Sequence, residues 1–375
     1  MDYYEFRDAI RSLGDVDAPV LTAYLDLTPA PDTGHPTAPA VFKKALAEAM
    51  TSLDLRHGSA ADSLAADAAA VEDAIASAVA EGARGLAVVT SSDAGFRYEL
   101  TSVHPFRNDV RVGSRPWMFE LERHGFELDQ PATVASVDHH SIHLVRIIHG
   151  EVAGQSHAET DPHATSKRRG RTAVEGRGAA GRTYGGGHSK NRLERAVEEK
   201  RATAAREAAA ELVSLAGAHD IVIVAGIDSA RAELLAHLPA AVAQRILERP
   251  AAAPGEVERT AAEVAADLAA STQLDLGDRF ASEILGGAHG ENHVSGVATV
   301  VRALAIGRAS AIVLHEDAVA NWGSAVDSRR HNGTADEGRF ELMVRQADAT
   351  GAEVLFSRLP ELLEQHEGAV ATTRW

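Results

Sequence analysis

The 375-residue chain has no cysteine, which excludes structural disulfides, thiolate zinc sites and a cysteine nucleophile. Aromatic residues are also scarce, at 5% of the chain. No stretch approaches the roughly 18–20 consecutive apolar residues that span a bilayer. The beginning, MDYYEFRDAI, lacks the basic and apolar segments of a secretory signal. We therefore expect a cytoplasmic protein with no membrane partner.

Charge is distributed unevenly along the chain. The 37 basic and 54 acidic residues give a net charge of −17, which argues against broad adhesion to nucleic acid or anionic membranes. Residues 167–201 nevertheless hold eleven basic and four acidic side chains, a net +7 that leaves −24 for the rest. Such a basic segment can enter a phosphate-lined channel while the acidic body limits binding elsewhere. A solvated insertion without a partner is the alternative that composition leaves open.

Helix and strand patterns alternate and predict a mixed α/β fold. Residues 20–27 alternate apolar and polar side chains, and the short apolar runs at 85–90, 221–225 and 310–314 are typical of buried strands. Residues 96–116 show no regular pattern. The length allows two or three domains. We expect three mixed α/β sandwich domains, at residues 1–130, 131–270 and 271–375.

A long polar segment at residues 154–188 interrupts the middle domain. It is rich in glycine, arginine, serine and threonine, and loops of this length in compact domains are usually functional or disordered. It ends in three glycines and His188, and a helical pattern starts at residue 189. Glycines let a main chain approach a ligand closely, and a helix N-terminus favours anionic groups. A nucleotide phosphate loop is excluded because no Gly-Lys-Ser/Thr follows.

The sequence GGGHSKNRLERAVEEKR at residues 185–201 resembles the catalytic loop and following helix of archaeal and eukaryotic class I release factors. In that family Gly-Gly-Gln-Ser precedes an arginine-bearing helix, so His188 stands in the glutamine position. The superfamily includes Pelota and bacterial release-factor-like proteins, among them ribosome hibernation factors. The resemblance covers about residues 20–375. Other segments that carry it are IVIVAGIDSAR at 221–231, ALAIGRASAIVLHED at 303–317, GAEVLF at 351–356 and GAVATTRW at 368–375.

The resemblance implies a three-domain release-factor/Pelota-like architecture and a role on the ribosome. The first domain would face the decoding site, and the middle domain would direct its loop to the peptidyl-transferase centre. The implied partners are ribosomal RNA, P-site transfer RNA and a translational GTPase such as elongation factor Tu, which the third domain would contact. The positions matching the catalytic loop are Gly186, Gly187 and His188. The basic residues expected to bind RNA are Lys167, Arg168, Arg169, Arg171, Arg177, Arg182, Lys190 and Arg192.

Departures from the family pattern restrict the function. Residues 38–44, APAVFKK, stand where an Asn-Ile-Lys-Ser-type motif would read stop codons, which argues against stop-codon reading. His188 retains the backbone N–H of the glutamine position, and an imidazole can bond water or act as a base near neutral pH. Two functions stay open. We favour a hibernation or rescue factor that binds the ribosomal A site; the alternative is a peptidyl-tRNA hydrolase that releases nascent peptides from stalled ribosomes.

Other groups of polar residues indicate function more weakly. A lone Asp138 is insufficient for a nuclease, so a metal-dependent nuclease is the least favoured hypothesis. Residues 286–290 lack the preceding strand of a dinucleotide site, and we expect no cofactor and no metal. Glu316 and Asp317 follow a strand, where α/β sheets often bind ligands, but the resemblance implies a protein or ribosomal surface there. Surface positions are expected for the histidines His139, His140, His143, His149, His157 and His163, because a metal site would need three well-placed ligands.

Overall fold

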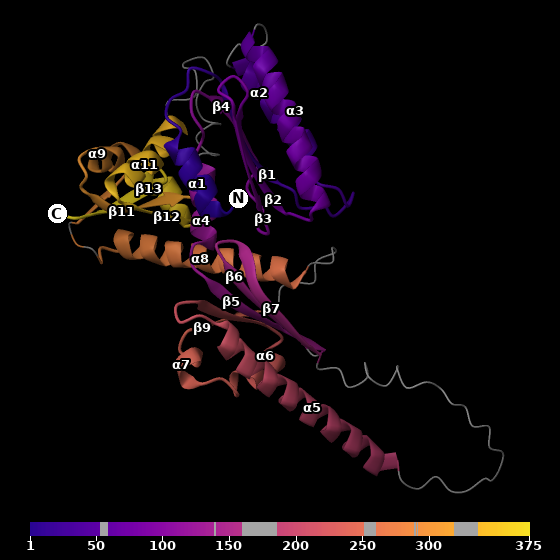
Figure 1. The fold of residues 1–375 in the computed structure, drawn as a ribbon. Helices are drawn as coiled ribbons and strands as arrows, with labels where there is room; N and C mark the ends of the chain where they lie inside the picture. Colours follow the sequence, from indigo (N-terminus) through magenta and orange to yellow (C-terminus); the bar gives the residue numbers. More distant parts are fainter. Residues whose placement is uncertain are drawn as a thin grey trace, which may run out of the picture. The chain divides into compact units, whose positions relative to one another are not determined.

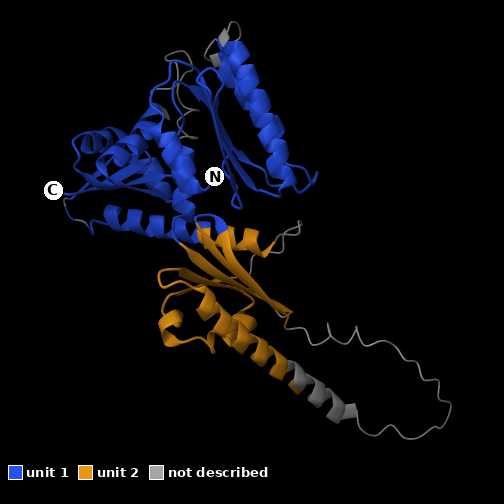
Figure 2. Ribbon diagram, viewed as in Figure 1, with its two compact units in different colours: residues 1–130, 149–151, 270–375 blue, residues 131–148, 152–269 orange. Residues whose placement is uncertain are grey.

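The computed structural model describes residues 1–52, 59–138, 140–159, 186–250, 260–288, 290, 292–318 and 337–375. Within these ranges, no helix is both long and apolar enough to cross a membrane. Helices surround three separate sheets, which confirms the mixed α/β fold expected from the sequence. The chain forms two compact units (Figure 2): unit 1 contains residues 1–130, 149–151 and 270–375, and unit 2 contains residues 131–148 and 152–269.

The first sheet of unit 1 is antiparallel, with the strand order β3-β2-β1-β4 (Figure 1). Its strands are β1 (Val20–Asp26), β2 (Gly85–Ser91), β3 (Phe96–Ser102) and β4 (Asp109–Gly113). The helices from this part of the chain are α1 (Tyr3–Ser12), α2 (Ala38–Ser52), α3 (Ser59–Ala80) and α4 (Phe119–Leu128).

Strand β1 is buried on both faces. Leu21 and Leu25 pack with side chains of α2 and α3, while Tyr24 belongs to a second core on the opposite face. The polar Thr22 is also buried, and its hydroxyl accepts a hydrogen bond from the backbone N–H of Trp117 at 3.2 Å. The apolar–polar alternation of this strand therefore does not mark a solvent-exposed face.

The second sheet of unit 1 has the order β10-β13-β11-β12, with β11 and β12 parallel and the other pairs antiparallel. Its strands are β10 (His293–Ser295), β11 (Ala309–His315), β12 (Glu353–Ser357) and β13 (Ala369–Thr373). The helices of this part are α9 (Val297–Ala305), α11 (Glu337–Thr350), α12 (Pro360–His366) and the end of α8 (Ala261–Leu285), which begins in unit 2.

One hydrophobic core joins the two sheets of unit 1. Helix α1 contributes Phe6 to it and α4 contributes Phe119. The Phe119 ring meets Phe340 and Phe356 edge-on, at centroid distances of 6.1 and 5.4 Å. The first and third of the expected domain ranges thus share a core within one compact unit.

Unit 2 is built on a five-stranded sheet in the order β7-β6-β5-β8-β9. Strands β5, β8 and β9 are parallel, and β6 is antiparallel to β5. The strands are β5 (Ala132–Val137), β6 (Ser141–Ile148), β7 (Glu151–Glu159), β8 (Ile221–Gly226) and β9 (Ile246–Pro250). The helices are α5 (Gly186–Leu215), α6 (Asp228–Leu235), α7 (Ala240–Ala243) and the beginning of α8.

Helices cover both faces of this sheet. Ala208 and Leu212 of α5 pack on one face, together with Val222 and Val224 of β8. The beginning of α8 packs on the other face, where Ala265 contacts the core side chains of β5 and β8. Side chains of β8 alternate between these two cores, which accounts for the continuous apolar run in its sequence.

The structure corrects three sequence expectations. Residues 96–116, which show no regular pattern, contain β3 and β4. Strand β7 continues through residue 159 into the segment expected to be a loop from residue 154. Helix α5 begins at Gly186, three residues before the expected start. Strands β3 and β7 each expose part of a face, so pairing with β2 and β6 specifies them more than hydrophobicity does.

The buried side chain of Asp220 holds the beginning of the parallel strands in unit 2 together through hydrogen bonds. Its side chain is 2% exposed and accepts hydrogen bonds from the Thr133 hydroxyl (2.7 Å), the Arg146 guanidinium (2.8 and 3.1 Å) and the Gly217 N–H (3.0 Å). Burial would raise the pKa of Asp220, but these donors hold the pKa below its ordinary value. One carboxylate therefore fixes β5, β6 and the start of β8 together.

Replacing Asp220 by asparagine should lower the free energy of unfolding by about 2–3 kcal/mol, because charge-assisted bonds to a buried group are lost. Hydrogen exchange by mass spectrometry should accelerate in β5 and β8. The carboxylate's contribution is present above its unfolded pKa of about 3.9, and is lost as the pH falls through the lower folded value.

Asp228→Asn is the matched control, because the Asp228 side chain is 92% exposed and pairs with Arg231 on the surface. Its expected effect is below about 0.5 kcal/mol. Equal losses from the two substitutions would show that the Asp220 network does not stabilise the sheet.

Candidate functional site

The ends of the glycine-rich segment are held by two elements of unit 2. Strand β7 ends at Glu159 and helix α5 begins at Gly186. The predicted catalytic positions Gly186, Gly187 and His188 therefore form the first turn of α5; the His188 side chain lies outside the described residues. Backbone N–H groups in a first helical turn have no acceptor within the helix, so they can donate to an anionic group.

The predicted RNA-binding side chains all lie outside the part of the chain that the structure describes. Two of the residues, Lys190 and Arg192, have their backbone in α5 but undescribed side chains. The remaining ones fall between β7 and α5: Lys167, Arg168, Arg169, Arg171, Arg177 and Arg182.

Helix α5 packs on the sheet only through its second half. Ala204 is the first of its described side chains to be buried in the core, whereas Arg195 and Lys200 are exposed. A helix rises about 1.5 Å per residue, so about 27 Å of helix separates Gly186 from Ala204. Unit 2 therefore anchors the predicted tip at the end of a long helix (Figure 1).

A small cavity lies at the carboxyl end of β5. Asp138, Arg201, Ser229 and Glu233 are among its lining residues, and its volume is about 80 Å³. Burial would raise the pKa of Asp138, but the N–H groups of His140 and Ser141 lower it. The cavity holds a few water molecules and is far below the roughly 300–1,000 Å³ of typical ligand pockets.

The histidines that the sequence places between residues 139 and 163 do not assemble into a three-ligand group within the described ranges. The rings of His143 and His157 face each other across β6 and β7, with centroids 4.3 Å apart. His140 is exposed, and His149 interacts through its ring nitrogen with the Tyr4 hydroxyl at 3.0 Å. The other two members of the expected set, His139 and His163, lie outside the described residues.

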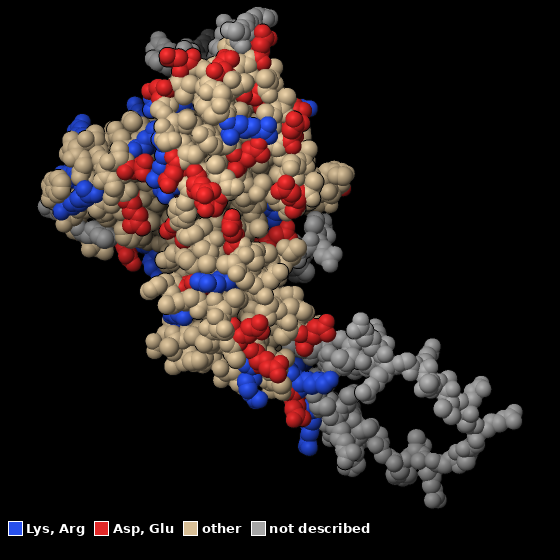
Figure 3. Space-filling view, viewed as in Figure 1, with Lys and Arg blue, Asp and Glu red and all other residues tan. Residues whose placement is uncertain are grey.

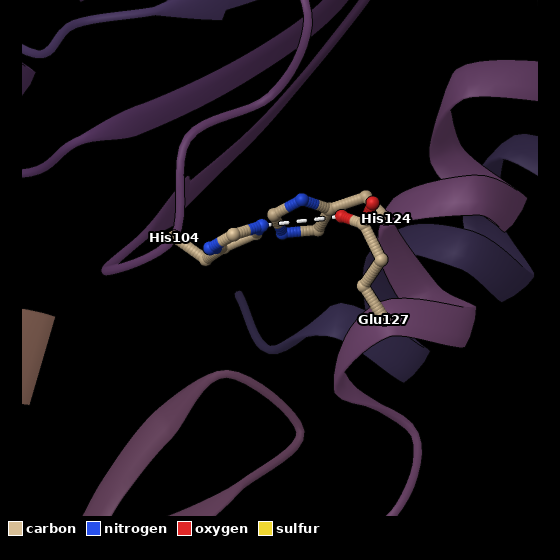
Figure 4. A group of neighbouring side chains, drawn as sticks. All are labelled: His104, His124 and Glu127. Carbon is tan, nitrogen blue, oxygen red and sulfur yellow. Dashed lines mark hydrogen bonds and ion pairs between the residues drawn. The ribbon is translucent and has the colours of Figure 1, made fainter. Parts of the chain in front are cut away.

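Helix α4 carries a buried charged cluster that sequence reasoning missed. His104 lies in the turn between β3 and β4, and its Nε2 pairs with the Glu127 carboxylate at 3.1 Å (Figure 4). Arg123 forms ion pairs with both Glu120 and Glu127. The His124 ring stacks on Phe106, with centroids 3.8 Å apart. The spacing of His124 and Glu127 on one helix was the available signal, but His104 joins them only in the fold.

Glu316 and Asp317 are engaged inside unit 1. Arg107 forms ion pairs with both carboxylates, at 2.8 Å for Glu316, whose side chain is 10% exposed. The glycines after α8 form a turn in which Gly287 and Gly290 have positive φ angles. The carboxylates and the glycines thus have local structural roles.

Figure 3 shows one face of the molecule. Among the described residues on this face, acidic and basic side chains are interspersed, and they form no large basic patch. The net +7 of residues 167–201 is therefore a property of the segment between β7 and α5 and of the first part of α5. Its position within unit 2 makes that end of the unit the candidate functional site.

Comparison with known proteins is consistent with this location. Residues 116–273 match the sequence model of bacterial archaeo-eukaryotic release factor family 10. No curated protein sequence matches the chain significantly.

Solved structures of translation termination factors and of Pelota superpose on the chain with low TM-scores. The archaeal translation termination factor aRF1 is 16% identical, with a TM-score of 0.29, over 100% of this chain and 99% of that chain. Archaeoglobus fulgidus Pelota is 14% identical, with a TM-score of 0.36, over 78% and 79% of the two chains. S. cerevisiae Dom34, a translation termination-like factor, is 11% identical, with a TM-score of 0.36, over 78% and 80%.

The resemblance to release factors rests on the family match, because superpositions with such low TM-scores do not support a relationship. The matched range includes the whole of unit 2, and with it both elements that hold the basic segment. The resemblance expected from the sequence is thereby supported: residues 116–273 are similar to the bacterial branch of the archaeo-eukaryotic release-factor superfamily.

Proposed function

We propose that the protein binds the ribosomal A site as a hibernation or rescue factor and directs the tip at Gly186, Gly187 and His188 toward the peptidyl-transferase centre. The observation that carries the proposal is the family match, which spans the basic segment and the strand and helix that hold it. A net charge of +7 on this segment suits a channel lined by RNA phosphates. Binding is independent of stop codons in this proposal.

The acidic remainder of the chain fits the same proposal. Its net charge of −24 opposes attachment to RNA anywhere except through residues 167–201. The proposed partners are ribosomal RNA and P-site transfer RNA, with a translational GTPase such as elongation factor Tu contacting the third part of the chain. Binding to ribosomes that is unaffected by added GTPase, in both its GTP and GDP states, would contradict this last contact.

Neutralising the basic segment should weaken ribosome binding. The variant changes Arg168, Arg169, Arg171 and Arg177 together to glutamine. Binding in co-sedimentation with vacant ribosomes should fall roughly tenfold or more at 0.1 M salt, and each lost phosphate contact should lower the salt-dependence slope by about 0.7–0.9.

The matched control changes four exposed arginines of unit 1 to glutamine, so that the total charge is altered equally: Arg97, Arg115, Arg279 and Arg302. This control should bind ribosomes as the unchanged protein does. Unchanged binding by the basic-segment variant, or an equal loss in the control, would remove the role proposed for the segment.

Peptidyl-tRNA hydrolysis is the alternative function, and the position of Gly186 and Gly187 at the start of α5 favours it specifically. Backbone N–H groups in this first turn can donate to the oxyanion that forms when water attacks the ester. The exchange of glutamine for His188 leaves these donors in place. The alternative therefore needs only a placed water in addition to the backbone.

A release assay separates binding from hydrolysis. Under the binding proposal, the protein releases no labelled peptide from stalled ribosomes beyond the spontaneous rate. Release that disappears in Gly187→Val would establish the hydrolase instead. Gly338→Val is the control, because Gly338 is also the second residue of a helix and a Cβ there meets nothing within 4 Å.

A further inference from the structure

Three potential metal ligands converge in unit 1, away from the basic segment. His124 and Glu127 lie on adjacent turns of α4, and His104 reaches them from the turn between β3 and β4 (Figure 4). One ligand atom from each residue lies within 4.8 Å of the other two. Residues three apart on a helix share one face, so α4 presents two ligands in fixed relation.

The distances approach those of a bound ion. Zinc bonds of about 2.0–2.1 Å in a tetrahedron place neighbouring ligand atoms about 3.3 Å apart. The His104 Nε2 and Glu127 Oε2 atoms are already 3.1 Å apart. The His124 ligand atom lies within 4.8 Å of both, so binding an ion requires this atom to move closer.

One buried nitrogen in this group lacks a partner. His124 is 2% exposed, and its Nε2 interacts with the Ser102 hydroxyl at 3.1 Å. Its Nδ1 is buried with no hydrogen-bond partner among the described residues. Buried polar atoms are almost always bonded, so this nitrogen is open to a ligand, although the Pro105 backbone also acts on the ring.

The residue types suit a cation. Glu127 offers a carboxylate oxygen, and each of the two histidines offers a ring nitrogen. The charge of Arg123 is shared with Glu120. Two imidazoles and a carboxylate form a ligand set that zinc accepts.

An ion can reach His104 and Glu127 from solvent. His104, Arg123 and Glu127 line a cavity of about 500 Å³ within unit 1, together with Arg107 and Glu316. The cavity leaves room for a water molecule in a fourth ligand position.

We propose that His104, His124 and Glu127 bind one divalent transition-metal cation of the zinc type, with a water from the cavity as the fourth ligand. The ion ties the turn between β3 and β4 to helix α4 and gives the His124 ring a partner. No metal was expected from the sequence, because the histidines that cluster along the chain are other ones. The site is independent of the ribosomal function proposed above.

Metal titration of the full-length chain without a polyhistidine tag tests the site. After chelator treatment and dialysis, calorimetry with Zn²⁺ should show one site per chain, and Zn²⁺ should raise the thermal unfolding midpoint. His104→Ala should weaken Zn²⁺ binding at least about tenfold, because a direct ligand is lost. His104 is the variant of choice because its side chain is 13% exposed, more than that of Glu127.

His143→Ala is the control, because His143 pairs with His157 in unit 2, and it should leave the Zn²⁺ affinity unchanged. A chain that binds no Zn²⁺ overturns the proposal, as does binding lost in His143→Ala and kept in His104→Ala. X-ray absorption of the zinc-loaded, unsubstituted protein gives a second measurement. It reports the ligand types directly and does not depend on how a variant folds. Two imidazoles with oxygen ligands are expected, and a shell without imidazole overturns the assignment.

Discussion

Unit 1 depends on the pairing of charges that helix α4 buries. An unpaired charge in such a position costs several kcal/mol, so each side chain needs a partner of opposite sign. Arg123 lies between two carboxylates of its own helix, and Arg7 and Arg11 of α1 both bond Glu122. Arg11 also pairs with Asp348 of α11. The buried charged side chains of α4, each between 2% and 7% exposed, are Glu120, Glu122, Arg123 and Glu127.

The beginning of α4 extends this dependence to the third part of the chain. The N–H groups of Met118 and Phe119 donate to the Glu341 carboxylate of α11, at 2.8 and 3.0 Å. Helix N-termini need such acceptors, and this one arrives from far along the sequence. Neither sheet of unit 1 can therefore satisfy α4 alone. In unit 2 the partners of the buried Asp220 lie closer in the fold, on β5, on β6 and in the turn before β8.

The sequence predicted the strands that are buried along their whole length. It did not predict elements whose buried charges pair with residues far away in the sequence. The apolar run of β8 predicted a buried strand, and the structure places one at Ile221–Gly226. Helix α4 escaped prediction because alternating charges such as Glu122 and Arg123 indicate a solvent-exposed surface unless their partners are known. The ligand group was hidden for the same reason, since His104 lies twenty positions from His124 in the sequence. The glycine-rich tip was predicted from its order relative to the helix and strand that follow it, and its role stays a prediction.

Two parts of the tip would have different roles in hydrolysis: the backbone would donate hydrogen bonds, and the side chain at position 188 would place the water. In the proposed hydrolysis, donors to a developing oxyanion would come from the first turn of α5, and they do not depend on the side chain at position 188. Placing a water is different, because it depends on the reach and protonation of that side chain. An imidazole is shorter and more rigid than the glutamine of the related release factors, and it changes charge near neutral pH. A loop with intact donors and a mispositioned water would bind at the peptidyl-transferase centre without hydrolysis. Under the proposed function, the side chain at position 188 would decide between a ribosome-bound plug and a release enzyme.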